Sequence, residues 1–249
     1  MSDYESNKIE WINSRPGELQ GYDCRECLNR GYSAVPRDDG HAMRECKCMK
    51  VRRSIRLIEK SGLKSLMERY TFDKYLTPEP WQESIKKKAM MFADNPDGRW
   101  FAVLGQTGCG KTHICSAIAG EFLKRSIPVY YALWNTEVKR LRATVNDGDE
   151  HEKAIEKLQK IDVLYIDDLF KCKHNAEPTD ADVRIAFEML NARYNSQRIT
   201  LISSEFNIDE LSNVDTAIAG RINEMCRTYV VNIERNTSRD YRWRIGDES

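Results

Sequence analysis

Short runs of apolar residues recur through the chain from about residue 67 onward, and the longer segments between them carry apolar residues at helical spacing. A continuous apolar run is typical of a strand that is buried on both faces of a sheet. The runs predict strands over residues 100–104, 126–132, 161–168, 198–204 and 228–233. The segments between them predict helices over residues 81–93, 113–123, 134–158 (with a break at 146–149), 181–194, 208–211 and 217–225. This alternation indicates an α/β fold with a central parallel sheet flanked by helices.

A glycine-rich loop joins the first of these strands to the helix that follows it, and it reads G-x-x-x-x-G-K-T. The glycines let successive backbone N–H groups turn toward phosphate oxygens, and the helix N-terminus adds partial positive charge. We expect Lys111 to reach the β- and γ-phosphates of a nucleotide and Thr112 to bind Mg²⁺. The expected nucleotide-binding residues are Gly105, Gln106, Thr107, Gly108, Cys109, Gly110, Lys111, Thr112, His113 and Asp167.

Two carboxylates, Asp167 and Asp168, end the strand predicted over residues 161–168. This is the Walker B pattern of a P-loop NTPase, and it lies about 55 residues after the glycine-rich loop. We expect Asp167 to join Thr112 in the Mg²⁺ shell and Asp168 to act as the general base on the attacking water. The predicted reaction is hydrolysis of ATP to ADP and phosphate. Related ATPases often carry Glu at position 168, and because Asp is shorter we expect slow hydrolysis that a partner stimulates.

Four of the eight cysteines gather near the N-terminus as a C-x-x-C pair and a C-x-C pair. In a reducing compartment such a cluster favours a metal over disulfides. Four thiolates surround Zn²⁺ and leave no open position, so we expect a structural site rather than a catalytic one. The expected ligands are Cys24, Cys27, Cys46 and Cys48.

The segment between the two cysteine pairs predicts a hairpin like that of a zinc ribbon. Residues 31–35 and 43–48 form its strands, and Asp39-Gly40 suits its turn. His41 is an alternative ligand in place of one cysteine, and free thiols in a loop are the alternative to a metal. A basic amphipathic helix follows through Lys60, suited to nucleic acid or an acidic partner, or to a solvated linker.

The bulk composition adds few constraints. The chain has 249 residues with 39 basic and 39 acidic side chains, so its net charge neither favours nor excludes nucleic acid. One local basic patch, Lys139, Arg140 and Arg142, is a candidate for contact with single-stranded nucleic acid, or is a solvated helix face. No apolar run approaches the roughly 18 residues of a membrane helix, and the N-terminus has no apolar signal core, so we expect a cytoplasmic protein without a membrane partner.

These motifs together resemble the DnaC/DnaI family of bacterial and phage replicative-helicase loaders, a branch of the AAA+ ATPases. The cysteine cluster resembles the zinc-containing, helicase-binding N-terminal part of the DnaI type. The resemblance implies a zinc-binding, helicase-interacting module with a basic helical linker over residues 1–66 and an AAA+ domain over 67–249. The other matching pieces are Thr71-Phe72-Asp73, Tyr165-Ile166-Asp167-Asp168, Ile202-Ser203-Ser204-Glu205, Ala219-Gly220-Arg221-Ile222 and Asp240-Tyr241-Arg242.

The resemblance also implies residue roles and partners. Arg221 corresponds to the arginine finger that reaches the γ-phosphate of a neighbouring subunit. Many family members carry Asn where this chain has Glu205, so Ser204 is the expected γ-phosphate sensor. Arg239 and Arg242 are candidates for a further sensing arginine. The implied partners are a hexameric replicative helicase, single-stranded DNA and further copies of the chain.

Two other functions remain open from the sequence. One is a transposition ATPase of the IstB type, which shares the ATPase core and binds duplex DNA, but whose members usually lack a four-cysteine module. The other is an adaptor that binds nucleotide without hydrolysing it and blocks a helicase.

Overall fold

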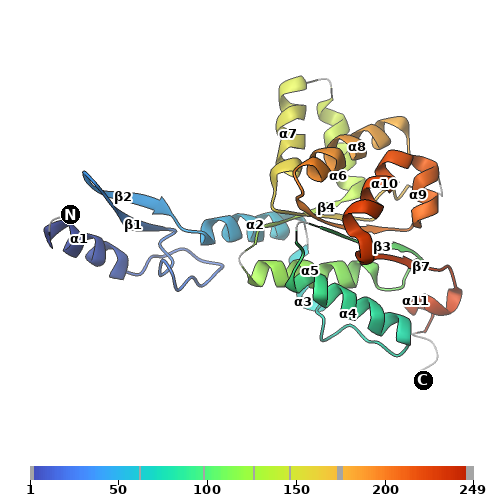
Figure 1. Ribbon diagram of the computed structural model, residues 1–249, viewed down its shortest axis with the longest axis horizontal. Coiled ribbons are helices and arrows are strands. Elements are labelled where there is room, and N and C mark those ends of the chain that lie inside the picture. Colours follow the sequence, from blue (N-terminus) through green and yellow to red (C-terminus); the bar gives the residue numbers. More distant parts are fainter. Residues whose placement is uncertain are drawn as a thin grey trace.

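A small N-terminal module projects from a larger α/β domain in the computed structural model (Figure 1). The structure describes residues 3–61, 63–97, 99–125, 127–145, 147–172 and 176–244. No helix among these residues is long and apolar enough to cross a membrane.

The larger domain is built on a parallel sheet. Within the described residues the strand order is β4-β5-β6-β3-β7, so β6 lies between the strand of the glycine-rich loop and the strand of the two carboxylates. The strands are β3 (Trp100–Gly105), β4 (Val129–Leu133), β5 (Val163–Asp167), β6 (Ile199–Ser204) and β7 (Val230–Ile233). Each lies within or beside a predicted apolar run, which confirms the α/β class.

Helices cover both faces of this sheet. Figure 1 shows α3, α4 and α5 on one face and α6 to α10 on the other. Successive side chains of a strand point to opposite faces, so Phe101 and Val103 pack in the first layer while Trp100 and Leu104 pack in the second. The helices are α3 (Leu63–Arg69), α4 (Pro80–Asp94), α5 (Lys111–Lys124), α6 (Trp134–Thr144), α7 (Gly148–Lys160), α8 (Asp180–Asn195), α9 (Ile208–Val214), α10 (Thr216–Cys226) and α11 (Tyr241–Arg244).

One buried arginine ties the elements of the second layer together. Arg193 of α8 is fully buried, and its guanidinium donates to the carbonyls of Leu158 and Ile161 at 2.8 and 2.9 Å and to Thr200 Oγ1 at 2.9 Å. Further bonds reach the carbonyls of neighbouring residues. Burying a charge is unfavourable unless its donors are satisfied, and here carbonyls at the end of α7 and the starts of β5 and β6 supply the acceptors.

The N-terminal module consists of a helix, a hairpin and the cysteine loops. Helix α1 (Asp3–Ser14) packs on strand β1 (Tyr32–Arg37), which pairs with β2 (Gly40–Glu45) in the predicted hairpin. Asn13 fixes this contact, because its amide exchanges two hydrogen bonds of 2.9 Å with the backbone of Ala34. The turn falls where Asp39-Gly40 predicts it, and Cys48 begins the following helix rather than lying on the hairpin.

Helix α2 (Cys48–Ser61) belongs to both parts of the molecule. It starts at a cysteine of the cluster, and Ile58 near its other end is buried in the core of the α/β domain. The expected boundary between residues 66 and 67 falls inside α3, which packs against α5. Within the described residues, α2 and α3 therefore lie between the cysteine cluster and the rest of the α/β domain.

The positive charges of the basic segments on α2 and α6 are partly neutralised by other groups of the chain. Arg52 on α2 is buried and donates to backbone carbonyls of the cysteine loops, and Arg53 pairs with Glu45 at 3.0 Å. Two of the three basic residues singled out on α6 are paired likewise. Arg140 pairs with Glu137, and Arg142 pairs with Asp182. The expected positive patches therefore present less free charge than the sequence suggests.

Candidate nucleotide site and cysteine cluster

The glycine-rich loop has the backbone conformation that phosphate binding requires. Gly105, Gly108 and Gly110 have φ values of 97°, 68° and 91°, in the region that L side chains rarely adopt. A Cβ on Gly105 would lie 2.2 Å from the Ile233 carbonyl oxygen, so only glycine fits there. Gly110 caps the N-terminus of α5, where unsatisfied backbone N–H groups favour an anion.

Lys111 lies inside this loop. Its ammonium donates to the carbonyls of Gly105 at 2.9 Å and Gln106 at 2.6 Å, and only 7% of the residue is exposed. Burial lowers the pKa of Lys111. The cation is therefore placed beside the backbone groups that would surround a phosphate chain.

Asp167 gathers hydroxyl groups around its carboxylate. Thr112 Oγ1 lies 3.1 Å from Asp167 Oδ1, and the Tyr131 hydroxyl donates to Oδ2 at 2.9 Å. Ser203 of β6 donates to the same carboxylate. Hydroxyl and carboxylate oxygens are the ligands that Mg²⁺ takes in nucleotide sites, so the Thr112–Asp167 pair fits that ion.

A cavity of about 330 Å³ opens over the loop. It brings together several expected residues from distant parts of the chain: Thr107, Gly108, Gly110, Lys111, Thr112, His113 and Asp168. It also includes Leu66 and Lys171, which the sequence did not single out. Tyr70 belongs to the aromatic stretch before the first strand, which the sequence places either in the core or near the adenine, and Glu205 and Tyr241 belong to motifs that carry the family resemblance.

The hydroxyl of Ser204 points away from this cavity. It is fully buried and donates to the Leu169 carbonyl at 2.7 Å. Ser203 and Glu205, on either side of it, face Asp167 and the cavity. The period-2 alternation of β6 was the signal that separates these residues, because adjacent side chains of a strand point to opposite faces.

Arg221 also lies outside the cavity of its own chain. It sits on α10 with its guanidinium 4.9 Å from the ring centre of Phe187, and it donates to Asn191 Oδ1 and the Ala217 carbonyl, both at 3.0 Å. Arg221 is therefore not among the described residues that line this cavity.

An aromatic segment covers the start of α5. His113 Nε2 lies 2.9 Å from the Thr71 carbonyl, and its ring stacks on Tyr70 with 4.8 Å between ring centres. Burial lowers the pKa of His113. Tyr70 also lines the cavity.

The C-terminal segment closes over the loop. The Tyr241 N–H donates to the Gly108 carbonyl at 3.1 Å, and a Cβ on Gly108 would lie 1.8 Å from Asp240 Oδ1. Of the two candidate sensing arginines, Arg242 lines the cavity, whereas Arg239 lies over Trp81, with 5.5 Å from its guanidinium carbon to the ring centre.

The four cysteines of the module converge on one point. Their sulfur atoms lie within 4.8 Å of one another, and all four residues are buried. The Cys24–Cys46 and Cys27–Cys48 sulfur separations are 3.8 and 3.5 Å, close to the roughly 3.8 Å that Zn–S bonds of about 2.3 Å impose on a tetrahedron. The donor set therefore fits Zn²⁺. His41 instead lies 3.0 Å from Glu5 of α1 and is not part of the cluster.

Backbone and side-chain contacts support the cysteine loops. Left-handed conformations at Leu28, Asn29 and Gly31 turn the chain after the first pair. Burial acts to raise the pKa of Cys27, but the Gly31 N–H that donates to its sulfur and the neighbouring thiols bring it down to about 7. Burial raises the pKa of Cys46 and Cys48 in the same cluster.

The fold and the nucleotide cavity define a P-loop ATPase of the AAA+ class. The model of the IstB-like ATP binding proteins matches residues 39–242, and the chain belongs to that family. The phage-like element PBSX protein XkdC of Bacillus subtilis (strain 168) is 33% identical over 236 residues, covering 90% of this chain and 87% of XkdC.

Two further comparisons concern helicase loaders. The replicative helicase loader DnaC of Escherichia coli (strain K12) is 25% identical over 175 residues, covering 69% of this chain and 68% of DnaC. The crystal structure of the DnaC helicase loader superposes with a TM-score of 0.59 at 20% identity, covering 67% of this chain and 98% of that one. This likeness shows that the fold is shared.

Proposed function

We propose that this protein uses ATP to load a hexameric replicative DNA helicase onto single-stranded DNA during replication initiation. The observation that carries the proposal is the continuity between its two candidate sites. Helix α2 begins at Cys48 of the cysteine cluster and reaches the core of the ATPase domain at Ile58. A change of nucleotide state at the cavity thus has a continuous helix through which to act on the module. The similarity to DnaC, a replicative helicase loader, supports the same function.

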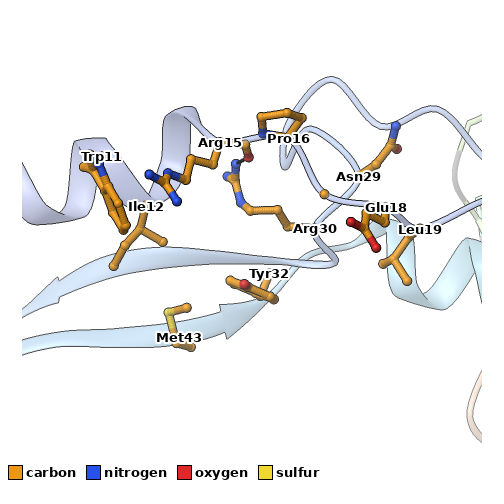
Figure 2. A pocket seen from close by; sticks show the side chains of 11 residues that line it. Trp11, Ile12, Arg15, Pro16, Glu18, Leu19, Asn29, Arg30, Tyr32 and Met43 are labelled. Atoms are coloured by element: carbon orange, nitrogen blue, oxygen red, sulfur yellow. Dashed lines mark hydrogen bonds between the residues drawn. The ribbon is translucent and has the colours of Figure 1, made fainter.

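The N-terminal module carries a surface suited to the helicase. A groove of about 790 Å³ lies between α1 and the hairpin, and Figure 2 shows Trp11 and Ile12 beside Tyr32 and Met43 there. Trp11 is 56% exposed, Met43 53% and Tyr32 40%. Exposed aromatic and methionine side chains gathered in one place are typical of protein interaction sites. We assign this groove, which lies in the same module as the cysteine cluster, to helicase contact.

The ATPase domain supplies the nucleotide-dependent step. Lys111 binds the phosphates, and Thr112 and Asp167 hold Mg²⁺, which when bound offsets phosphate charge. Asp168 accepts the proton of the attacking water. Because Asp168 is short, we expect slow hydrolysis that the helicase stimulates, so that ATP turnover times release of the loader.

Arg221 completes the site of a neighbouring copy. It projects from α10 and does not line the cavity of its own chain. If the neighbour supplies this charge, a mixture of Lys111→Ala and Arg221→Ala chains will regain part of the ATPase activity that each variant lacks alone. Mixed assemblies contain interfaces with both an intact loop and an intact arginine, which is why activity returns.

The loading reaction itself tests the proposal. The helicase is mixed with the protein, ATP and a single-stranded circle, and loaded helicase is measured as unwinding of an annealed labelled strand. We expect Lys111→Ala and the double variant Trp11→Ala/Met43→Ala each to reduce loading about 10-fold or more. The controls are Lys160→Ala, an exposed lysine of α7, and Leu76→Ala, a 70% exposed apolar residue of the ATPase domain.

Full loading by both test variants would refute the proposal. Two other results would redirect it. Binding to duplex DNA without any helicase contact would favour a transposition ATPase, the other function associated with this family. Helicase binding that blocks unwinding, with no ATP turnover, would favour a non-hydrolysing adaptor.

A further inference from the structure

A turn directly after β5 brings a second lysine into the nucleotide cavity. Lys171 Nζ lies 2.9 Å from Asp168 Oδ2 and 2.9 Å from Glu205 Oε1. Asp168 follows β5 and Glu205 follows β6, so this one ammonium joins carboxylates from two neighbouring strands. All three residues line the cavity together with Lys111 and Thr112.

The backbone of this turn is unusual. Asp168 and Phe170 have φ values of 58° and 61°, and a positive φ is rare for a residue other than glycine and strained for an aromatic one. The Asp168 N–H donates to Ser203 Oγ at 2.9 Å, and Phe170 is fully buried against Trp134. The fold therefore holds a strained turn in place, and the result is that Lys171 points back at Asp168.

Structural stabilisation alone does not account for the arrangement. The side chains of Lys171, Asp168 and Glu205 are 35%, 22% and 32% exposed, and ion pairs that water reaches contribute little to stability. Residues held in strained conformations cluster at functional sites, where the strain serves the mechanism. The position of Lys171 in the cavity points to a role toward the nucleotide.

The charges around the cavity indicate what that role is. Asp168 and Glu205 would both repel the terminal phosphate of a triphosphate at this edge of the cavity. Lys171 is the cation that lies between them, and Lys111 is bound within the glycine-rich loop. ADP has no γ-phosphate to occupy the edge of the cavity beside Lys171. A cation at this edge therefore interacts with ATP but not with ADP.

We propose that Lys171 binds the γ-phosphate of ATP and that Glu205 positions it. This proposal rests on the proposed ATPase function. Lys171 leaves Asp168 for the γ-phosphate, and Asp168 is then free to act on water. Water adds to the γ-phosphorus, the bond to the bridging oxygen of ADP breaks, and Asp168 takes the proton of the water. General-base action thereby depends on a bound triphosphate.

Nucleotide affinity measured with both ATP and ADP tests this assignment. Fluorescent ATP and ADP analogues are titrated into the full-length protein with Mg²⁺. We expect Lys171→Met to weaken ATP binding about 10-fold while ADP binding is unchanged, because one charge-assisted contact is lost. Lys171→Arg keeps the preference for ATP. The control is Lys160→Met, which removes an exposed, paired lysine on α7.

The role of Glu205 in positioning the Lys171 ammonium is tested by the ATP-to-ADP affinity ratio of Glu205 variants. Glu205→Ala frees the ammonium from its second anchor, and we expect a reduced ATP-to-ADP affinity ratio that Glu205→Gln restores in part. If Lys171→Met does not fold, Lys171→Gln takes its place. The wild-type protein gives an independent measurement, because ATP but not ADP should shield Lys171 from an amine-reactive reagent.

Three outcomes would overturn the proposal. They are an unchanged ATP-to-ADP affinity ratio in Lys171→Met (whether or not both affinities fall), an unchanged ratio in Glu205→Ala, and equal shielding of Lys171 by the two nucleotides. Failure of the proposed helicase loading looks different, because the wild-type protein would then load no helicase while its ATP-to-ADP affinity ratio still depended on Lys171.

Discussion

The cysteine module and the ATPase domain are held together by different forces. The module has a two-stranded hairpin and a buried cluster of four cysteines with two partly buried hydrophobic neighbours, Tyr22 and Met49. The ATPase domain buries two apolar layers on either side of its sheet. A two-stranded hairpin is at best marginally stable alone, whereas a large apolar core spreads stability over many contacts. We therefore expect the module to depend on a metal at its cysteine cluster, whereas the stability of the ATPase domain is spread over many groups.

Each part also contains one buried arginine, and the two arginines have corresponding roles. Arg52 donates to the carbonyls of Gln20 and Tyr22, both at 2.6 Å, and to Asn29 Oδ1 at 2.8 Å. Arg193 likewise donates to carbonyls at the ends of helices and strands. In both places a buried guanidinium joins backbone carbonyls from segments that are distant in sequence. This similarity allows the two parts to be compared by the same substitution.

Removal of zinc should have the largest effect and should be confined to the module. A structural zinc contributes about 10–16 kcal/mol to the folding of small domains, more than a hairpin of this size supplies. We expect a strong chelator to abolish amide protection in β1 and β2 while the central sheet stays protected in hydrogen exchange. Cys27→Ser should do the same, and Cys172→Ser, outside the cluster, should leave zinc content unchanged. Loss of protection in the whole chain at once would contradict the separation of the two parts.

Arg193→Met should have the next largest effect, and it should be confined to the ATPase domain. The substitution leaves several buried carbonyls without donors, so we expect the free energy of unfolding to fall by about 3 kcal/mol. Denaturant titration followed by the fluorescence of buried Trp100 measures it, with zinc stoichiometry unaffected. Arg184→Met, an exposed position on the same helix, should change stability by less than about 0.5 kcal/mol. Equal effects of the two variants would show that the buried network contributes nothing.

Arg52→Met should weaken zinc binding without unfolding the ATPase domain. Asn29 Oδ1 accepts from both Arg52 and the backbone N–H of Cys24, so the guanidinium supports the loop that presents a ligand. Loss of such outer support typically reduces metal affinity about 10- to 100-fold. Competition with a chromogenic chelator measures the change. Arg53→Met is the matched control because its side chain is 57% exposed, and an equal loss of affinity there would contradict the assignment.

Much of the ATPase site was predictable because its chemistry is local in sequence. The glycine-rich loop needs fixed spacings within eight residues, and Asp167 and Asp168 end a buried strand, so each motif was recognisable by itself. The cysteine cluster was recognisable for the same reason. The sheet followed from its apolar runs, although β4 and β5 begin later than the sequence predicts.

The remaining features of the site depend on the direction in which individual side chains point, which a sequence pattern does not give. Ser203 rather than Ser204 faces Asp167, because the strand's pleat decides which of two adjacent serines points into the site. Lys171 reaches the cavity because Asp168 and Phe170 have positive φ angles, and no turn motif in the sequence predicts these angles. The basic stretch on α2 looked like a charged surface, yet Arg52 turns inward to bind carbonyls, since backbone acceptors at a distant loop are invisible in a linear pattern.

Removal of one helix cap should show that each single group contributes little to the free energy of unfolding of the ATPase domain. Thr179 caps α8 and exchanges side-chain and backbone hydrogen bonds with Asp182 in a capping box. We expect Thr179→Ala to lower the free energy of unfolding by about 1 kcal/mol, since the cap satisfies donors at the helix start. Thr136→Ala, exposed inside α6, is the control and should have a smaller effect in the same denaturant titration. If Thr179→Ala instead abolished folding, stability in this domain would be concentrated in a few groups, as we expect for the cysteine module, and the contrast between the two parts would fail.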